Sequence, residues 1–163
     1  MAVRIFATGG TFDKEYNELN GTLFFKESHV PEMLKLGRCE TDIEFRTLMM
    51  MDSLALKDYD RRIILENCRS CPEDKIVITH GTDSMVETAK MLQANIKDKT
   101  VVLTGAMIPY KFGSSDGLFN LGCAIAYAKA LPHGVYVVMN GHCFNPSNVF
   151  KNRAVGKFEK LRK

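Results

Sequence analysis

Five short apolar segments, rich in valine and isoleucine, recur along the 163-residue chain and are bounded by turn-forming residues. This combination is typical of buried strands. The longer segments between them carry apolar residues three or four positions apart, as amphipathic helices do. Because strand alternates with helix, the sequence predicts parallel pairing with right-handed crossovers, in a three-layer, doubly wound α/β fold. The expected strands are Val3–Ala7, Ile43–Leu48, Lys75–Thr79, Thr100–Thr104 and Gly134–Met139.

A turn signal marks the end of the last expected strand. Asn140-Gly141 favours a two-residue hairpin, so the strand from Gly134 should turn back into an antiparallel partner at His142–Phe144. The sheet is therefore expected to be mostly parallel, with an antiparallel hairpin near the C-terminus. The expected helices are Leu56–Cys71, with Tyr59, Ile63, Ile64 and Cys68 on its apolar stripe, Ser84–Ala94, with Met85, Ala89 and Leu92, and Leu118–Leu131.

The segment from Phe12 to Val30 fits neither the strand period nor the helix period, and it carries Gly21 among asparagines and charged residues. A long irregular loop directly after the first strand is a candidate active-site lid. The alternative is a strand hairpin around Asn20-Gly21 that covers an edge of the sheet. The spacing leaves both interpretations open.

Length, charge and cysteine content bound the kind of protein. Residues 1–163 are expected to form one domain, and a net charge of +3 does not indicate a nucleic-acid partner. Without a membrane-spanning stretch or a signal peptide, no membrane association is expected and the expected location is the cytoplasm. Five cysteines fit reduced thiols, and we interpret Cys68 and Cys71 as half-buried helix-end thiols rather than a redox or metal pair.

Small hydroxyl-bearing residues follow four of the apolar segments. If those segments are neighbouring parallel strands, all four turns lie on one edge of the sheet, where open α/β folds bind ligands. The sequence therefore predicts one site built from all four. The turns are Ala7-Thr8-Gly9-Gly10-Thr11, Met51-Asp52-Ser53, His80-Gly81-Thr82-Asp83-Ser84 and Thr104-Gly105-Ala106.

The spacing of these turns leaves two possible roles open for Thr11 and two for Asp83. Gly9 and Gly10 let the backbone approach a ligand and supply N–H donors. Thr11 is therefore either a nucleophile beside an oxyanion site or part of a phosphate cradle. Asp83 is either a helix N-cap or, with Thr82, a group that polarises a nucleophile and holds an ammonium.

The paired motifs Thr8-Gly9-Gly10-Thr11 and His80-Gly81-Thr82-Asp83 resemble the signatures of the bacterial-type L-asparaginase family. Each motif is weak alone, and four in order are specific. The resemblance implies hydrolysis of L-asparagine to L-aspartate and ammonia, through a threonine nucleophile and an acyl-enzyme, without a cofactor. The likeness continues in the family's order through Val101–Met107, Ser115-Asp116-Gly117 with Asn120, and Val137–Asn140.

The family's catalytic roles carry over to matching positions. Thr11 matches the nucleophile, and Tyr16 resembles the tyrosine that short members place beside it. Lys151, within Asn148-Val149-Phe150-Lys151-Asn152, resembles the catalytic lysine that lies next to Thr82 and Asp83. The resemblance therefore implies one cluster assembled from three distant parts of the chain.

Substrate recognition is implied at the same edge. Ser53 and nearby backbone amides would accept the α-carboxylate, and Asp83 would pair with the α-ammonium; for Ser53 alone, turn capping is the alternative. Leu54 stands where many members have a polar residue, which bears on strictness for asparagine. The substrate-binding residues implied are Gly10, Asp52, Ser53, Gly81, Asp83 and Ala106.

The chain is similar to short, single-domain members, without the C-terminal domain that supplies a further acidic residue in longer ones. A homo-oligomer, dimer or higher, is expected to cover the site. His80, Asp83 and Ser84 are too close along one turn to form a hydrolase triad, and no histidine spacing indicates a metal. The alternatives are a glutaminase or other small-amide hydrolase, and a non-catalytic amino-acid-binding protein or a component of an amidotransferase.

Overall fold

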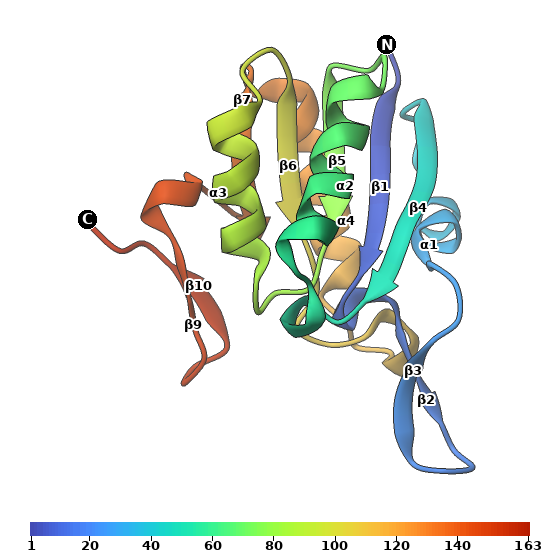
Figure 1. Cartoon of the computed structure of the whole chain (residues 1–163). Coiled ribbons are helices and arrows are strands. Elements are labelled where there is room, and N and C mark those ends of the chain that lie inside the picture. The colour runs from blue at the N-terminus through green and yellow to red at the C-terminus, as the bar shows by residue number, and fades with distance from the viewer.

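The computed structural model describes all 163 residues and places six strands in one sheet, in the order β4-β1-β5-β6-β7-β8 (Figure 1). All neighbouring pairs are parallel except β7 and β8, so the predicted mostly parallel sheet and its antiparallel hairpin are confirmed. β1 and β4 continue beyond their predicted ends. The strands are β1 (Val3–Gly9), β4 (Ile43–Met51), β5 (Lys75–Thr79), β6 (Thr100–Thr104), β7 (Gly134–Met139) and β8 (His142–Phe144).

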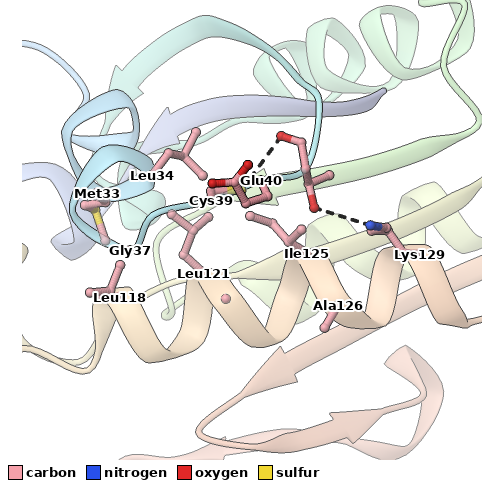
Figure 2. A pocket seen from close by; sticks show the side chains of 12 residues that line it. Met33, Leu34, Gly37, Cys39, Glu40, Leu118, Leu121, Ile125, Ala126 and Lys129 are labelled. Carbon is pink, nitrogen blue, oxygen red and sulfur yellow. Dashed lines mark hydrogen bonds between the residues drawn. The ribbon is translucent and has the colours of Figure 1, made fainter. Parts of the chain in front are cut away.

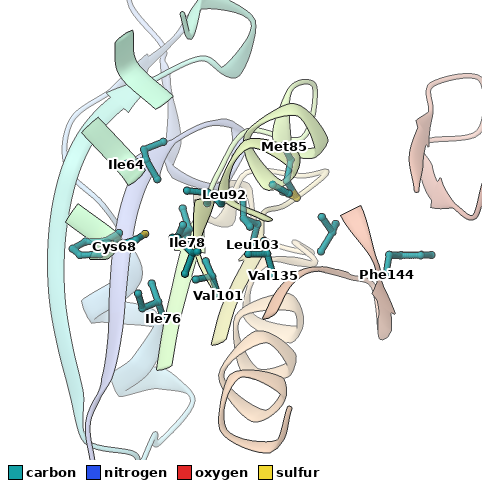
Figure 3. Close-up of a cluster of buried hydrophobic side chains, with 14 of the residues drawn as sticks. Ile64, Cys68, Ile76, Ile78, Met85, Leu92, Val101, Leu103, Val135 and Phe144 are labelled. Carbon is teal, nitrogen blue, oxygen red and sulfur yellow. The ribbon is translucent and has the colours of Figure 1, made fainter. Parts of the chain in front are cut away.

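Helices cover both faces of this sheet. α2 (Asp58–Ser70) and α3 (Met85–Asn95) pack on one face, and α1 (Val30–Leu36) and α4 (Gly117–Ala130) pack on the other. Figure 3 shows the first core, where side chains of α2 and α3 lie against Ile76 and Ile78. The intervening Val77 belongs to the second core, because successive strand residues face opposite sides. The three-layer arrangement is thus confirmed. None of the helices combines the length and apolar content that a bilayer crossing requires.

The apolar stripe of α2 differs in part from its prediction. Tyr59 is 73% exposed, whereas Arg61, Ile64 and Cys68 are buried. Tyr59 stands two positions before Arg61, which places it on the opposite side of the helix. Cys68 is fully buried rather than half-buried, Cys71 is half-buried at the helix end, and all five cysteines are free thiols.

The segment after β1 is a hairpin, β2 (Lys14–Asn17) with β3 (Thr22–Phe25), that projects beyond the sheet (Figure 1). The irregular-loop interpretation is therefore wrong. The hairpin around Asn20-Gly21 is confirmed, but it projects away from the sheet and does not cover its edge. Gly21 turns the chain with φ +71°, and the Asn20 carboxamide accepts the Thr22 N–H. Most of the hairpin's side chains are exposed or half-buried, so its sequence lacks the apolar alternation that marks a half-buried strand.

A second hairpin, β9 (Phe150–Asn152) with β10 (Lys157–Glu159), follows the sheet and was not predicted. Its strands pair only with each other. Phe158 is 7% exposed and joins the first core, which holds the hairpin against the domain.

A buried polar chain connects α2 and α3 to the end of β5. His80, directly after β5, is 0% exposed and its Nδ1 lies 2.7 Å from the Gly81 carbonyl oxygen. Its Nε2 lies 2.8 Å from the Thr88 hydroxyl on α3. Arg61 of α2 donates its Nε–H to the same hydroxyl across 3.2 Å. These contacts satisfy polar groups that would otherwise be costly to bury.

Stability should fall as the pH drops from about 6.5 to about 4. Burial lowers the pKa of His80 from 6.5 to about 4, so the unfolded chain binds a proton that the folded chain excludes. The loss between pH 7 and 4.5 should be about 2 kcal/mol from this group, measured by urea unfolding of wild type and His80→Asn. An identical pH dependence in both proteins would contradict the assignment.

Candidate active site

Three of the predicted turns touch at the carboxyl edge of the sheet, and glycines make the contact possible. A Cβ atom on Gly10 would lie 2.4 Å from both Cα and N of Gly81. A Cβ on Gly81 would in turn lie 2.6 Å from the Ser53 hydroxyl oxygen. Gly10 also has φ +76°, which favours glycine. The turns after β1, β4 and β5 therefore meet backbone to backbone.

The fourth turn lies beside them but offers only its backbone. A Cβ on Gly105 would lie 2.4 Å from the His80 carbonyl oxygen, so the turn after β6 packs directly on the turn after β5. Ala106 is 1% exposed and its side chain belongs to the second core. The predicted contribution of Ala106 to a ligand is therefore limited to main-chain groups.

Lys151 of β9 reaches across to the turn after β5. Its Nζ lies 2.7 Å from the Thr82 hydroxyl oxygen and 2.9 Å from Oδ1 of Asp83. The side chain of Lys151 is 15% exposed and Thr82 is 5% exposed, so solvent screens this contact little. α3 begins after Ser84, which makes the N-cap interpretation of Asp83 wrong. The three residues form the polar centre of the site.

Thr11 lies just before the first hairpin, and Tyr16 lies within it on β2. Thr11 opens a short 3-10 helix, Thr11–Asp13, and is half-buried next to the Gly10 contact with Gly81. The Gly10 N–H donates to the Met51 carbonyl across 2.9 Å, so this predicted free donor is occupied. Tyr16 is 54% exposed on β2 and stacks edge-on against Phe112, with ring centroids 6.5 Å apart. It forms no hydrogen bond to Thr11 in this conformation.

The turn after β4 is held by its own polar contacts. Ser53 is 2% exposed, its hydroxyl accepts the Ser84 N–H across 3.2 Å, and its carbonyl accepts the Ser84 hydroxyl across 2.6 Å. Asp52 accepts the Leu54 N–H and pairs with Lys14 across 2.7 Å. Lys14 and that N–H hold the pKa of the Asp52 carboxyl below its usual range.

Two cations at this edge were not anticipated from the sequence. Lys14 follows Thr11 by three residues and pairs with Asp52. Arg153 follows Lys151 by two residues, and its guanidinium lies 3.3 Å from the Oδ1 of Asp83 that Lys151 also contacts. Arg153 lies in the turn that follows β9, so no strand periodicity in the sequence identifies its contact with Asp83.

Two cavities lie away from this cluster. Figure 2 shows one of about 320 Å³ between α1 and α4, bordered by Met33, Leu121 and Lys129. Another, of about 570 Å³, lies between the β6–α4 connection and the second hairpin, with Asp116 and Lys157 on its wall. None of the predicted site residues lines either cavity. No group of three or more His, Cys, Asp or Glu side chains is arranged to hold a metal ion.

Known proteins match this chain over nearly its full length. Residues 2–159 match the family model "Asparaginase, N-terminal". The chain is 34% identical to a probable periplasmic L-asparaginase of Haemophilus influenzae, over 91% of this chain and 46% of that protein. It is 31% identical to a component of the glutamyl-tRNA(Gln) amidotransferase of Thermococcus kodakarensis, over 86% of this chain and 33% of that protein.

A solved structure agrees with the sequence matches. The thermostable L-asparaginase from Thermococcus kodakarensis superposes with a TM-score of 0.88 at 28% identity, over 100% of this chain and 52% of that one. The chain spans about half the length of the L-asparaginases it matches. By its family model and its fold, the chain belongs to the asparaginase family, of which it matches the N-terminal domain.

Proposed function

We propose that the protein hydrolyses L-asparagine to L-aspartate and ammonia, with Thr11 as the nucleophile. The observation that carries the proposal is the contact of Lys151 with Thr82 and Asp83, which precede it by 69 and 68 residues. The turn of Thr11 packs on that of Thr82 through Gly10 and Gly81. A hydroxyl nucleophile, a second hydroxyl, a carboxylate and an ammonium thus share one edge of the sheet.

The proposed reaction has two steps. Thr11 Oγ1 bonds to the side-chain amide carbon of asparagine, and its proton ends on the nitrogen that leaves as ammonia. Water then adds to the resulting ester, restores the proton to Oγ1 and releases aspartate. Lys151 donates to the Thr82 hydroxyl oxygen, which leaves the Thr82 hydrogen free to orient the reacting groups.

Substrate binding is proposed at Asp83, with Ser53, Asp52 and the Gly10 and Gly81 backbone beside it. The α-ammonium of the substrate would join Asp83, whose Oδ1 is already shared by two cations. The second carboxylate oxygen remains for the ligand. Cations that share one carboxylate repel one another. Lys151 and Arg153 therefore compete with the α-ammonium for Asp83 and lower the affinity for an amino acid.

The first hairpin is proposed as the lid. Tyr16 stands 54% exposed on β2, three residues after Asp13 ends the 3-10 helix that contains Thr11. Pivoting at this helix would carry the phenol over the nucleophile and exclude water. The aromatic contact with Phe112 is the interaction that such closure replaces.

The principal alternative is an amidotransferase-type role, in which the site supplies ammonia to a partner or only binds an amino acid. The 31% identity to a component of the glutamyl-tRNA(Gln) amidotransferase supports this alternative. Glutamine differs from asparagine by one methylene, which a pocket discriminates by about 1–3 kcal/mol. Ammonia release from asparagine and from glutamine by the isolated chain, compared directly, separates these possibilities.

We further propose a homo-oligomer and a cytoplasmic location. Leu36 and Phe119 are 62% and 60% exposed on the helices of one face, and closed symmetric assembly commonly buries such side chains. Five free thiols are consistent with a reducing compartment. Sedimentation of the purified chain tests the first proposal, and localisation of the tagged full-length product tests the second.

Replacing Thr11 should abolish turnover without abolishing binding. Thr11→Ala removes the attacking oxygen, so ammonia release should fall by at least about 1,000-fold, while calorimetric binding of aspartate persists. The control is Thr22→Ala, whose hydroxyl contacts only Asn20 on the exposed hairpin. Full activity in Thr11→Ala would remove the nucleophile assignment.

Replacing Lys151 should reduce kcat by about 100-fold or more, because Thr82 and Asp83 lose their shared donor. Lys151→Met keeps an unbranched side chain that is one atom shorter and removes the charge. Lys157→Met, on the paired strand of the same hairpin, is the matched control and should keep wild-type kcat. Steady-state ammonia assays compare the two, and equal kcat values would contradict the role of Lys151.

Removing Arg153 should tighten substrate binding. Arg153→Ala frees Asp83 from an exposed cation, and such pairs contribute about 0–1 kcal/mol, so KM should fall by up to about five-fold with kcat unchanged. The effect should shrink in high salt. Arg162→Ala serves as the exposed-arginine control, and a raised KM in Arg153→Ala would refute competition at Asp83.

A further inference from the structure

The hydrogen bonds that link Gly81, His80, Thr88 and Arg61 can each run in only one direction. A carbonyl oxygen only accepts, so the His80 Nδ1 that lies 2.7 Å from the Gly81 oxygen must carry the proton. In a neutral ring the Nε2 then accepts, and the Thr88 hydroxyl donates to it. That hydroxyl accepts in turn from the Arg61 Nε–H. Arg61 itself is held by Glu87 across 3.1 Å.

His80 thereby holds the peptide group that leads into Thr82. The chain contains no cis peptide bond, so the Gly81 carbonyl and the Thr82 N–H point in opposite directions. With the carbonyl directed at the buried imidazole, the N–H faces away from it, and it has no backbone acceptor. The orientation of the Gly81–Thr82 peptide therefore determines the direction in which the Thr82 N–H points.

The same peptide group is closely packed on its other sides. Gly81 lies against Gly10 of the nucleophile turn and against Ser53, at distances that leave no room for a side chain. A rotation of the Gly81 carbonyl would therefore also disturb the Thr11 turn. Small displacements of this kind are costly to catalysis, because a 1 Å error in placing a reacting group can cost about 100-fold in rate.

We propose that His80 is a positioning residue, which fixes the Gly81–Thr82 peptide through its Nδ1–H, and that Thr88 and Arg61 keep it in this tautomer. The inference rests on the proposed function, because the peptide it fixes belongs to the proposed catalytic turn. His80 touches neither substrate nor reacting atoms in this assignment. Its contribution should therefore appear in kcat far more than in KM.

Two variants of His80 separate the two ring nitrogens. The amide nitrogen of Asn stands at the position of Nδ1, as many bonds from the backbone, whereas that of Gln stands at the position of Nε2. His80→Asn should keep kcat within about three-fold, and His80→Gln should lower it by about 10- to 100-fold at nearly unchanged KM. Equal losses in both variants, or a loss confined to KM, would overturn the proposal.

Nuclear magnetic resonance gives a readout that does not depend on activity. In wild type, the nitrogen shifts of the His80 ring should show a protonated Nδ1 and a bare Nε2 from pH 7 down to pH 5. The Thr82 amide signal should move in His80→Gln and stay in His80→Asn. An Nε2–H tautomer, or an equal Thr82 shift in both variants, would overturn the assignment even if the protein releases no ammonia and the proposed function fails.

Variants of Thr88 cover the case in which a His80 variant does not fold. Thr88→Val removes the donor to Nε2 at nearly constant volume and should lower kcat several-fold, whereas Thr88→Ser should restore it. The nitrogen signals of the His80 ring should shift or broaden in Thr88→Val, because Nε2 loses its donor while Nδ1 keeps the Gly81 carbonyl, and they should return in Thr88→Ser. Unchanged ring signals and kcat in Thr88→Val would show that the hydrogen bond from Thr88 does not act on the site.

Discussion

The site depends on backbone contacts that exclude every side chain larger than hydrogen. Gly10 and Gly81 meet at distances that a Cβ atom could not occupy, and Gly81 meets Ser53 in the same way. These contacts join the turns after β1, β4 and β5, although β4 and β5 lie on opposite sides of β1 in the sheet. The turns that carry the candidate residues Thr11, Ser53 and Thr82 are placed relative to one another by these contacts.

The polar groups of the site are already paired in the free protein. Asp52 holds Lys14, Asp83 holds Lys151, and the turn of Ser53 holds Ser84. A ligand therefore exchanges partners with the protein rather than meeting bare charges, so each new hydrogen bond contributes modest net free energy. Affinity then depends on how well the ligand satisfies several groups at once, which favours one shape over related ones.

The fold was predictable where burial imposes a pattern. β5, β6 and β7 are covered on both faces, and their Val- and Ile-rich segments gave correct boundaries. The first hairpin was predicted only as one of two alternatives, because none of the side chains of β2 and β3 is buried and no periodicity distinguishes these strands from a loop.

The part of the candidate site that lies in the turns after parallel strands was predictable from the sequence. Parallel strands bring their turns to one edge, so Thr11, Ser53 and Thr82 were expected together. The contact of Lys151 with Thr82 and Asp83 was predicted from the family resemblance and not from the spacing of residues. Arg153 and Arg61 were missed because their partners depend on how a short hairpin and two helices pack, which no local pattern encodes.

The hairpin that carries Lys151 stands apart from the sheet in its pairing. β9 and β10 have three residues each and bond only to one another, with Phe158 as the main apolar anchor. Detachment of such a unit is a local opening, with a smaller free energy than global unfolding. The population of molecules in which Lys151 contacts Thr82 and Asp83 is therefore set by the docking equilibrium of this peripheral element, and the chain can remain folded while the candidate site is disassembled.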